Sequence, residues 1–356
     1  MTSDHQPIAG RNSTPDPAGP ARILVVKLSS LGDVVHVTPC LKALRRAYPR
    51  AEIVMAVDQR FADVVRDDSN VNVLIRSRRV PGGTVAWWFQ TVREIAPHRE
   101  RPFDLAVDFQ GTQRSALWVY ASRARVKAGR GGWRPGWRVV IRPDFSRHAV
   151  RVCADIAERI GIPVRDLNPE LHVADENDRM VGDLLKESGM PGEGFVVFNP
   201  FSRWRSKVWP FERYAELARR LREKVGAPMV VSGGPGEEGQ ADELMRLMRP
   251  GDAVSLAGKL TLGQSMALYK RSKLMVTGDT GPMHVAAALG TRVVALFGPT
   301  FPERTGPWGE GHVVLQALRP PRHHAYRTDR TGAYMEAIDV NSVFDAVQSV
   351  LGRSPG

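Results

Sequence analysis

Residues 276–290 begin at the end of one apolar run, continue through a short polar turn and enter a second apolar run. The turn, Asp279-Thr280-Gly281-Pro282, predicts the start of a helix, because Thr280 suits an N-cap and Pro282 suits a first turn. The first amides of a helix lack intrahelical acceptors and attract phosphate. His284 lies one turn further along and faces either this phosphate or the core. The stretch is therefore a candidate phosphate site, although an ordinary strand-to-helix turn carries the same Gly and Pro residues.

Two further turns carry polar side chains that suit a nucleotide. Ser202 and Lys207 belong to a basic loop after an apolar run, and a cation beside helix amides suits a diphosphate. A solvated basic surface loop is the alternative. Glu237 follows the Gly-rich turn 232–236, where it is placed to accept hydrogen bonds from ribose hydroxyls. The chain contains no Walker lysine motif, and this turn is not GxGxxG, so the usual nucleotide fingerprints are absent.

Asp33 is the candidate general base. It stands at the predicted start of a helix, after the apolar run 22–27 and the polar turn 28–32. An Asp in this position either caps the helix or accepts a proton from a ligand. Ligands of open α/β sheets bind beyond the carboxyl ends of the strands, which is where this turn is expected to lie.

Apolar strand-like runs alternate with helix-like segments, including one continuous helix predicted over 34–48, and this alternation predicts an α/β protein with parallel sheets. The pattern restarts near residue 195, so two Rossmann-like halves with a cleft between them are expected. We predict a disordered lead at 1–20, a first domain at 21–180, a second domain at 190–330 and a final amphipathic helix within 331–356.

The composition is that of a globular protein. The chain has 356 residues, of which 42% are hydrophobic, and it lacks the long apolar run of a membrane-spanning helix. The segment 1–20 has no basic start and no apolar core, so it does not read as a signal peptide. The two cysteines, Cys40 and Cys153, argue against a disulfide framework and fit a reducing cytosol, and no Cys/His cluster has zinc spacing.

Positive charge is concentrated in one part of the chain. The net charge is +12, and residues 76–151 hold 16 Lys and Arg against 5 Asp and Glu, a local charge of +11. Five of the eight tryptophans, Trp87, Trp88, Trp118, Trp133 and Trp137, lie in the same segment. A basic, Trp-rich surface suits nucleic acid, an acidic membrane surface or a phosphorylated lipid. A solvated basic face over buried tryptophans is the alternative.

Six short motifs occur in order between Arg22 and Leu351. They are Lys27-Leu-Ser-Ser-Leu-Gly-Asp-Val-Val-His36 with Pro39, Phe103-Asp-Leu-Ala-Val-Asp-Phe-Gln-Gly111, Ser202 through Lys207-Val-Trp-Pro210, Gly233-Gly-Pro-Gly-Glu237, Gly278-Asp-Thr-Gly-Pro-Met-His284 and Phe297-Gly-Pro-Thr300. In this order and spacing the chain resembles the bacterial lipopolysaccharide heptosyltransferases of glycosyltransferase family 9.

The resemblance implies a GT-B fold whose last helix returns to the first domain. It also implies inverting, metal-independent transfer of heptose from ADP-L-glycero-D-manno-heptose to the inner core of lipopolysaccharide, with no cofactor. Asp33 matches the family's catalytic base. The residues that match the family's donor and nucleotide contacts are Ser202, Lys207, Glu237, Asp279, Thr280, Gly281 and His284.

The acceptor implied by the resemblance is an anionic, lipid-linked oligosaccharide: Kdo-lipid A or an extended inner core. His148-Ala-Val-Arg151 is similar to the family's His-Ala-Val-Glu-Arg element but lacks its Glu. The expected acceptor contacts are Arg78, Arg79, Arg114, His148 and Arg151. We expect a cytoplasmic monomer at the inner membrane face of a Gram-negative bacterium, with peripheral membrane contact and no nucleic-acid partner.

Two other functions fit parts of the sequence. The scaffold also suits another nucleotide-sugar transferase or an epimerase, because a fold does not fix its chemistry. The basic segment alone suits a non-catalytic protein that binds polyanions or lipid. The residues leave open which heptose is added, which hydroxyl accepts it, and whether the base is adenine or uracil.

Overall fold

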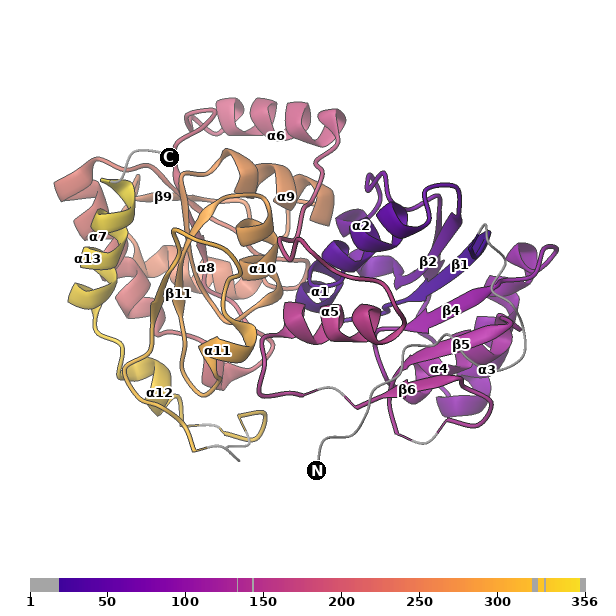
Figure 1. Cartoon of the computed structure of the whole chain (residues 1–356). Helices are drawn as coiled ribbons and strands as arrows, with labels where there is room; N and C mark the ends of the chain where they lie inside the picture. The colour runs from indigo at the N-terminus through magenta and orange to yellow at the C-terminus, as the bar shows by residue number, and fades with distance from the viewer. Residues whose placement is uncertain (1–18, 133, 143, 322–325, 330, 353–356) are drawn as a thin grey trace. The chain divides into compact units, whose positions relative to one another are not determined.

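The computed structural model describes residues 19–132, 134–142, 144–321, 326–329 and 331–352. The chain divides into two compact units, Met1–Glu170 and Leu171–Gly356, coloured indigo to magenta and magenta to yellow in Figure 1. Nearly all of the predicted lead at 1–20 lies outside the described residues.

Unit 1 is built on a six-stranded parallel sheet in the order β3-β2-β1-β4-β5-β6. The chain moves outward from β1 to β3, then returns to the other side of β1 and moves outward again to β6. The switch point therefore lies between β1 and β4, where a parallel sheet leaves a crevice at the strand ends. The strands are β1 (Arg22–Val26), β2 (Glu52–Asp58), β3 (Val73–Ser77), β4 (Leu105–Asp108), β5 (Val126–Arg130) and β6 (Val139–Ile141).

The helices of unit 1 connect these strands. The continuous helix predicted over 34–48 is wrong: the segment forms two helices that meet at His36 and Val37. Pro39 lies in the first turn of the second helix, where its missing N–H costs no hydrogen bond. The helices are α1 (Leu31–Val35), α2 (Thr38–Ala47), η1 (Gln59–Val64), α3 (Gly83–Ile95), η2 (Ala96–His98), α4 (Gln113–Ala121) and α5 (Ala149–Arg159).

Two of the tryptophans in the basic segment lie in the core of unit 1. Trp118 is fully buried, and Trp137 is 9% exposed, in the cluster that packs beneath β1 and β2. Trp133 lies outside the described residues. The expectation of a Trp-rich surface is therefore wrong for Trp118 and Trp137, because their rings fill the core.

Unit 2 repeats the same topology, with the parallel order β12-β11-β10-β7-β8-β9. Its switch point lies between β7 and β10, which pair with each other at the centre of the sheet. The strands are β7 (Val196–Asn199), β8 (Met229–Val231), β9 (Ala253–Ser255), β10 (Leu274–Gly278), β11 (Arg292–Leu296) and β12 (Val313–Leu315).

The first helix of unit 2, α6, precedes the sheet of that unit. Helix α6 packs on α9, and the Arg271 guanidinium lies 2.7 Å from the Asp178 carboxylate, so the unit starts at Leu171. The helices are α6 (Asp175–Glu187), η3 (Arg205–Lys207), α7 (Phe211–Val225), α8 (Glu238–Leu247), α9 (Leu262–Arg271), α10 (Gly281–Ala288), α11 (Pro302–Thr305), α12 (Ala333–Glu336) and α13 (Val340–Leu351).

The last helix belongs to unit 2. The resemblance implies that this helix returns to the first domain, but α13 packs on α7 and on strands β10 to β12. Its apolar side chains Val343, Phe344 and Val347 join the unit 2 core. The Trp209 indole also donates to the Ile338 carbonyl at 2.9 Å, which fixes the segment before this helix.

Candidate active site

One candidate site lies at the switch point of unit 1. Strand β1 ends at Val26, and the chain then turns into α1, which carries Asp33 in its first turn. The Gln110 side chain, beyond the end of β4, accepts a hydrogen bond from the Ser29 amide at 2.9 Å. The two turns that flank the switch point are therefore joined, and Asp33 is held at the carboxyl edge of the sheet.

Both carboxylate oxygens of Asp33 accept hydrogen bonds. The Lys27 ammonium donates to Oδ1 at 3.2 Å, and the Ser30 amide and hydroxyl donate to Oδ2 at 3.0 and 2.8 Å. Burial alone would raise the pKa of Asp33, but Lys27 and Ser30 outweigh it and hold that pKa well below its usual range. The side chain is still 41% exposed, so an ionised carboxylate faces solvent where a substrate can reach it.

Lys27 is a site residue to which the sequence assigned no role. Its side chain is 1% exposed, and its ammonium also donates to the Phe109 carbonyl at 3.3 Å. A buried ammonium requires charge pairing, and Asp33 supplies it. The signal in the sequence is a lysine that directly follows a fully apolar strand.

Another candidate site lies at the switch point of unit 2. The loop after β7 carries Lys207, and the turn after β10 carries Asp279. The Lys207 ammonium lies 2.6 Å from Asp279 Oδ2 and 3.4 Å from the Asp279 carbonyl oxygen. Both side chains are about one-tenth exposed, at 11% and 9%, so the pair is largely desolvated. The cation is thereby fixed beside the start of α10.

The start of α10 has the form expected from the sequence. Thr280 is the N-cap residue, and Pro282 occupies the first turn, so the amides that follow have no carbonyl of the same helix to bind. His284 is 7% exposed on this helix. Gly278 permits close packing of the basic loop on β10. A Cβ at this position would lie 3.0 Å from the Lys207 carbonyl oxygen.

An aromatic side chain that the sequence did not single out covers Lys207. The Lys207 ammonium lies 4.6 Å from the centre of the Tyr326 ring, and the Ser206 hydroxyl donates to the Tyr326 carbonyl at 2.7 Å. Tyr326 in turn meets Trp204 edge-on at 6.2 Å. Ser202 is half-buried nearby in the sequence, and its hydroxyl accepts from the Trp204 amide at 3.3 Å.

Glu237 closes the Gly-rich turn beyond β8. Its Oε2 accepts a hydrogen bond from the Gly234 amide at 2.7 Å, and burial raises the pKa of this carboxyl, partly offset by that bond. A Cβ on Gly233 would lie 2.8 Å from the Phe201 ring, so glycine at this position serves packing. The carboxylate thus lies in the turn that follows β8, at the carboxyl edge of the unit 2 sheet.

The family model of glycosyltransferase family 9 (heptosyltransferase) matches residues 96–335, which is more than half of the chain. The chain belongs to glycosyltransferase family 9. It is therefore a glycosyltransferase, and the resemblance that the motifs carry is confirmed.

Relatives across the family match most of the chain. Lipopolysaccharide heptosyltransferase 3 of Escherichia coli K12 is 25% identical over 90% of this chain and 95% of its own length. Lipopolysaccharide heptosyltransferase 1 of Pseudomonas aeruginosa is 29% identical and covers 83% of each chain. The solved E. coli ADP-heptose LPS heptosyltransferase II superposes with a TM-score of 0.79 at 24% identity, over 93% of this chain and 98% of that one. The GT-B expectation for the fold is confirmed.

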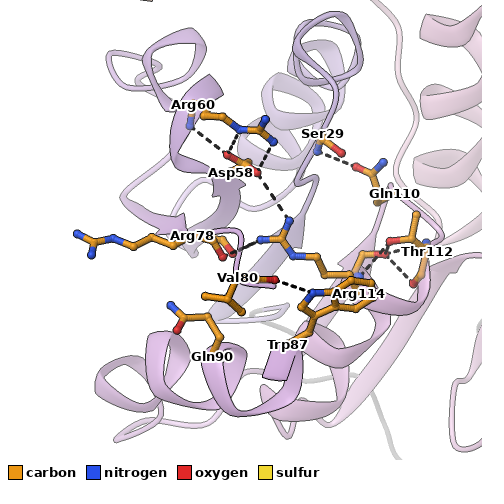
Figure 2. A network of polar contacts seen from close by, with 12 residues as sticks. Ser29, Asp58, Arg60, Arg78, Val80, Trp87, Gln90, Gln110, Thr112 and Arg114 are labelled. Carbon is orange, nitrogen blue, oxygen red and sulfur yellow. Dashed lines mark hydrogen bonds and ion pairs between the residues drawn. The ribbon is translucent and has the colours of Figure 1, made fainter. Parts of the chain in front are cut away.

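The acceptor residues expected from this family fall into two groups within unit 1. Figure 2 shows the first group, in which Arg114 reaches across the ends of β2 and β3. Its guanidinium donates to the Ser77 hydroxyl and the Arg78 carbonyl at 3.0 Å each, and lies 3.7 Å from the Asp58 carboxylate. Arg60 chelates the same buried Asp58 at 2.9 Å. Arg114 is therefore committed to interactions within the protein.

The side chains of Arg78 and Arg79 are exposed, and in Figure 2 the Arg78 guanidinium points away from the network.

The second group of expected acceptor residues lies at the start of α5. His148 is the N-cap of α5, and its ring meets the His36 ring edge-on at 5.6 Å. Arg151 lies 3.7 Å from Glu158 on the same helix. His36 ends α1, so the second group lies beside the helix that carries Asp33.

The described residues contain no group of three or more His, Cys, Asp or Glu side chains placed to hold a metal ion. Lysines lie at both switch points. Lys207 pairs with Asp279 beside the start of α10 in unit 2, and Lys27 pairs with Asp33 in unit 1.

Proposed function

We propose that this protein moves heptose from ADP-L-glycero-D-manno-heptose to the inner core of lipopolysaccharide. The observation that supports the proposal is that one switch point carries a candidate base and the other carries a candidate phosphate-binding lysine. An ionised, accessible carboxylate stands at that of unit 1, and a fixed lysine beside a helix N-terminus stands at that of unit 2. The names of the related lipopolysaccharide heptosyltransferases and of the solved ADP-heptose enzyme support the same donor and acceptor.

The chemistry assigned to Asp33 is general base catalysis. Asp33 takes the proton of an acceptor hydroxyl, and the oxygen forms a bond to the anomeric carbon of the heptose. The bond from that carbon to the diphosphate oxygen breaks, and ADP leaves with its electron pair. Because attack and departure occur on opposite faces, the anomeric configuration inverts. Lys27 and Ser30 keep the carboxylate ionised and aimed.

We assign the stabilisation of the negative charge that develops on the leaving ADP to protein groups, with no metal and no cofactor. Lys207 and the Thr280 to Gly281 start of α10 offer a cation, amides and the positive end of the helix dipole. Asp279 holds Lys207 in place before the donor arrives. Ser202 and His284 complete the contacts to the diphosphate and sugar, and Glu237 accepts from the ribose hydroxyls.

The acceptor is proposed to be an anionic, lipid-linked oligosaccharide, either Kdo-lipid A or an extended inner core. Arg78 and Arg79 are exposed and offer guanidinium groups to its phosphates or carboxylates. His148 and Arg151 form the second set of acceptor contacts. The enzyme then works as a monomer at the cytoplasmic face of the inner membrane, without nucleic acid.

Calorimetry with ADP and UDP in the presence of EDTA tests the donor half. We expect ADP to bind in EDTA and UDP to bind more weakly. Preferential binding of UDP would contradict the ADP-heptose assignment while leaving the family intact. Binding only after a divalent metal is restored would contradict metal independence.

A further inference from the structure

Helix α3 presents large apolar side chains to solvent. Phe89 is 70% exposed and Val85 is 69% exposed, the two highest values among the large apolar side chains of the described residues. Trp88, between them in sequence, is 38% exposed. These three residues span only five positions, whereas the other exposed apolar side chains are scattered over both units. Scattered exposure is ordinary, but a concentration on one helix calls for a partner.

The spacing places these side chains together. Val85 and Phe89 are four residues apart, and Val85 and Trp88 are three apart, so they are neighbours on one helix face. The second half of α3 is anchored: Thr91 and Ile95 are buried, and α3 packs on α4, beside which Figure 1 draws it. We call the exposed set of Val85, Trp88 and Phe89 the α3 face.

Basic side chains are frequent in the segment that carries the α3 face. Residues 76–101 hold six arginines and two glutamates, a local charge of +4. Arg76, Arg78, Arg79 and Arg93 are exposed, and none has a salt bridge to a described carboxylate. Glu94, one of the two acids, already accepts the Arg78 amide at 2.8 Å. An apolar face with an uncompensated cationic rim is complementary to an anionic surface with an apolar interior.

We propose that the α3 face docks on the surface of an anionic lipid bilayer. Trp88 and Phe89 suit the boundary between headgroups and acyl chains, and the flanking arginines suit anionic headgroups. Three side chains are too few for the core of a stable protein interface, which needs roughly 800 Å² on each partner. No helix in the described ranges is long and apolar enough to cross a membrane.

The inference goes beyond the proposed transfer reaction and is tested without it. The probe is co-sedimentation of the full chain with sucrose-loaded vesicles of phosphatidylcholine, alone or mixed with phosphatidylglycerol. We expect binding to the mixed vesicles and little binding to phosphatidylcholine alone. Lack of binding to the mixed vesicles would overturn the proposal, whatever the protein does with ADP-heptose.

A paired substitution locates the surface. Val85→Ser with Phe89→Ser is expected to lower the vesicle partition coefficient about tenfold or more, because two apolar side chains no longer enter the interface. Met180→Ser with Leu247→Ser removes exposed apolar side chains of unit 2 and is expected to leave binding unchanged. Equal binding by both double variants would overturn the proposal.

A charge variant tests the rim. Arg76→Gln with Arg93→Gln is expected to weaken binding to the mixed vesicles about fivefold per charge. Arg46→Gln with Arg50→Gln, also exposed in unit 1, is the matched control.

Sedimentation velocity without lipid tests whether a second copy of the chain covers the α3 face instead. If the wild type self-associates and the Val85→Ser, Phe89→Ser variant does not, the face is a dimer interface and the lipid proposal fails.

Discussion

Lys207 and Asp279 form an ion pair in which Nζ and Oδ2 lie 2.6 Å apart, although 72 positions separate the residues in the sequence. The pair joins the loop after β7 to the turn after β10, the two strands that flank the switch point of unit 2. A lysine fixed in this way does not need to be ordered when a diphosphate binds. However, the Asp279 carboxylate and a bound phosphate compete for the same Lys207 ammonium.

This competition predicts opposite behaviour of two substitutions. Lys207→Ala is expected to weaken ADP binding about tenfold to a hundredfold, because a charge-assisted contact to the phosphates is lost. Asp279→Asn is expected to leave ADP binding equal or tighter, because the competing carboxylate is removed. Calorimetry measures both, with Lys270→Ala at an exposed site of unit 2 as control. Weakening by Asp279→Asn as large as that by Lys207→Ala would contradict the competition.

A second prediction concerns the pH dependence of transfer. Asp33 acts as a base only when ionised, and Lys27 holds its pKa well below the usual range. In Lys27→Met that support is lost while burial still disfavours the charge, so the pKa rises. The acid limb of the kcat/KM profile should therefore move to higher pH by about 1 pH unit or more.

Lys42→Met is the matched control for this profile, since Lys42 pairs with Asp166 at 3.0 Å and not with Asp33. ADP affinity should be unaffected in Lys27→Met, because the donor site belongs to unit 2. An acid limb that stays in place in Lys27→Met would show that Lys27 does not support the ionised base.

A third prediction uses a glycine. A methyl group on Gly278 would meet the Lys207 carbonyl at 3.0 Å, so Gly278→Ala should displace the basic loop and weaken ADP binding. Gly239→Ala meets nothing within 4 Å on α8 and should stabilise the protein by about 0.5–1 kcal/mol. Thermal melting and calorimetry separate the two effects. Unchanged ADP affinity in Gly278→Ala would mean that the loop adjusts without cost to the site.

A fourth prediction separates acceptor binding from support. Arg79→Ala removes an exposed guanidinium and should raise the KM for the acceptor with little change in melting temperature. Arg114→Ala removes the contacts to Ser77 and Arg78 and should lower the melting temperature as well. If Arg79→Ala left the acceptor KM unchanged, Arg79 would not be an acceptor contact.

Much of the candidate site could be predicted from the sequence, because the residues at each switch point follow local patterns. Mostly apolar runs marked the central strands β1, β4, β7 and β10, and the turns that follow β1, β7 and β10 carry Asp33, Lys207 and Asp279. Strand β5, which lies between β4 and β6, was not anticipated, since Lys127 and Gly129 interrupt its apolar pattern. The edge strands β6 and β12 were not anticipated either, since each has only three residues. Helix α3 was missed as well, since its exposed apolar residues hide the usual periodicity.

Tertiary partners were beyond the sequence. An amphipathic pattern shows that α13 buries one face, but not that this face meets α7 and β10 to β12. Likewise, nothing local reveals that Lys27 bends back to Asp33, or that Arg114 spans from Ser77 to Asp58. These contacts follow from strand order, which brings distant turns to one edge.

The most direct test of the account is transfer from ADP-heptose, in EDTA, to deacylated inner-core acceptors that carry different numbers of heptoses. The wild type should form a product with inverted anomeric configuration on at least one acceptor. Asp33→Asn should lose about a hundredfold or more in kcat while its ADP affinity is retained. Retained configuration, or full activity of Asp33→Asn, would contradict the assignment of Asp33 as the base of an inverting transfer.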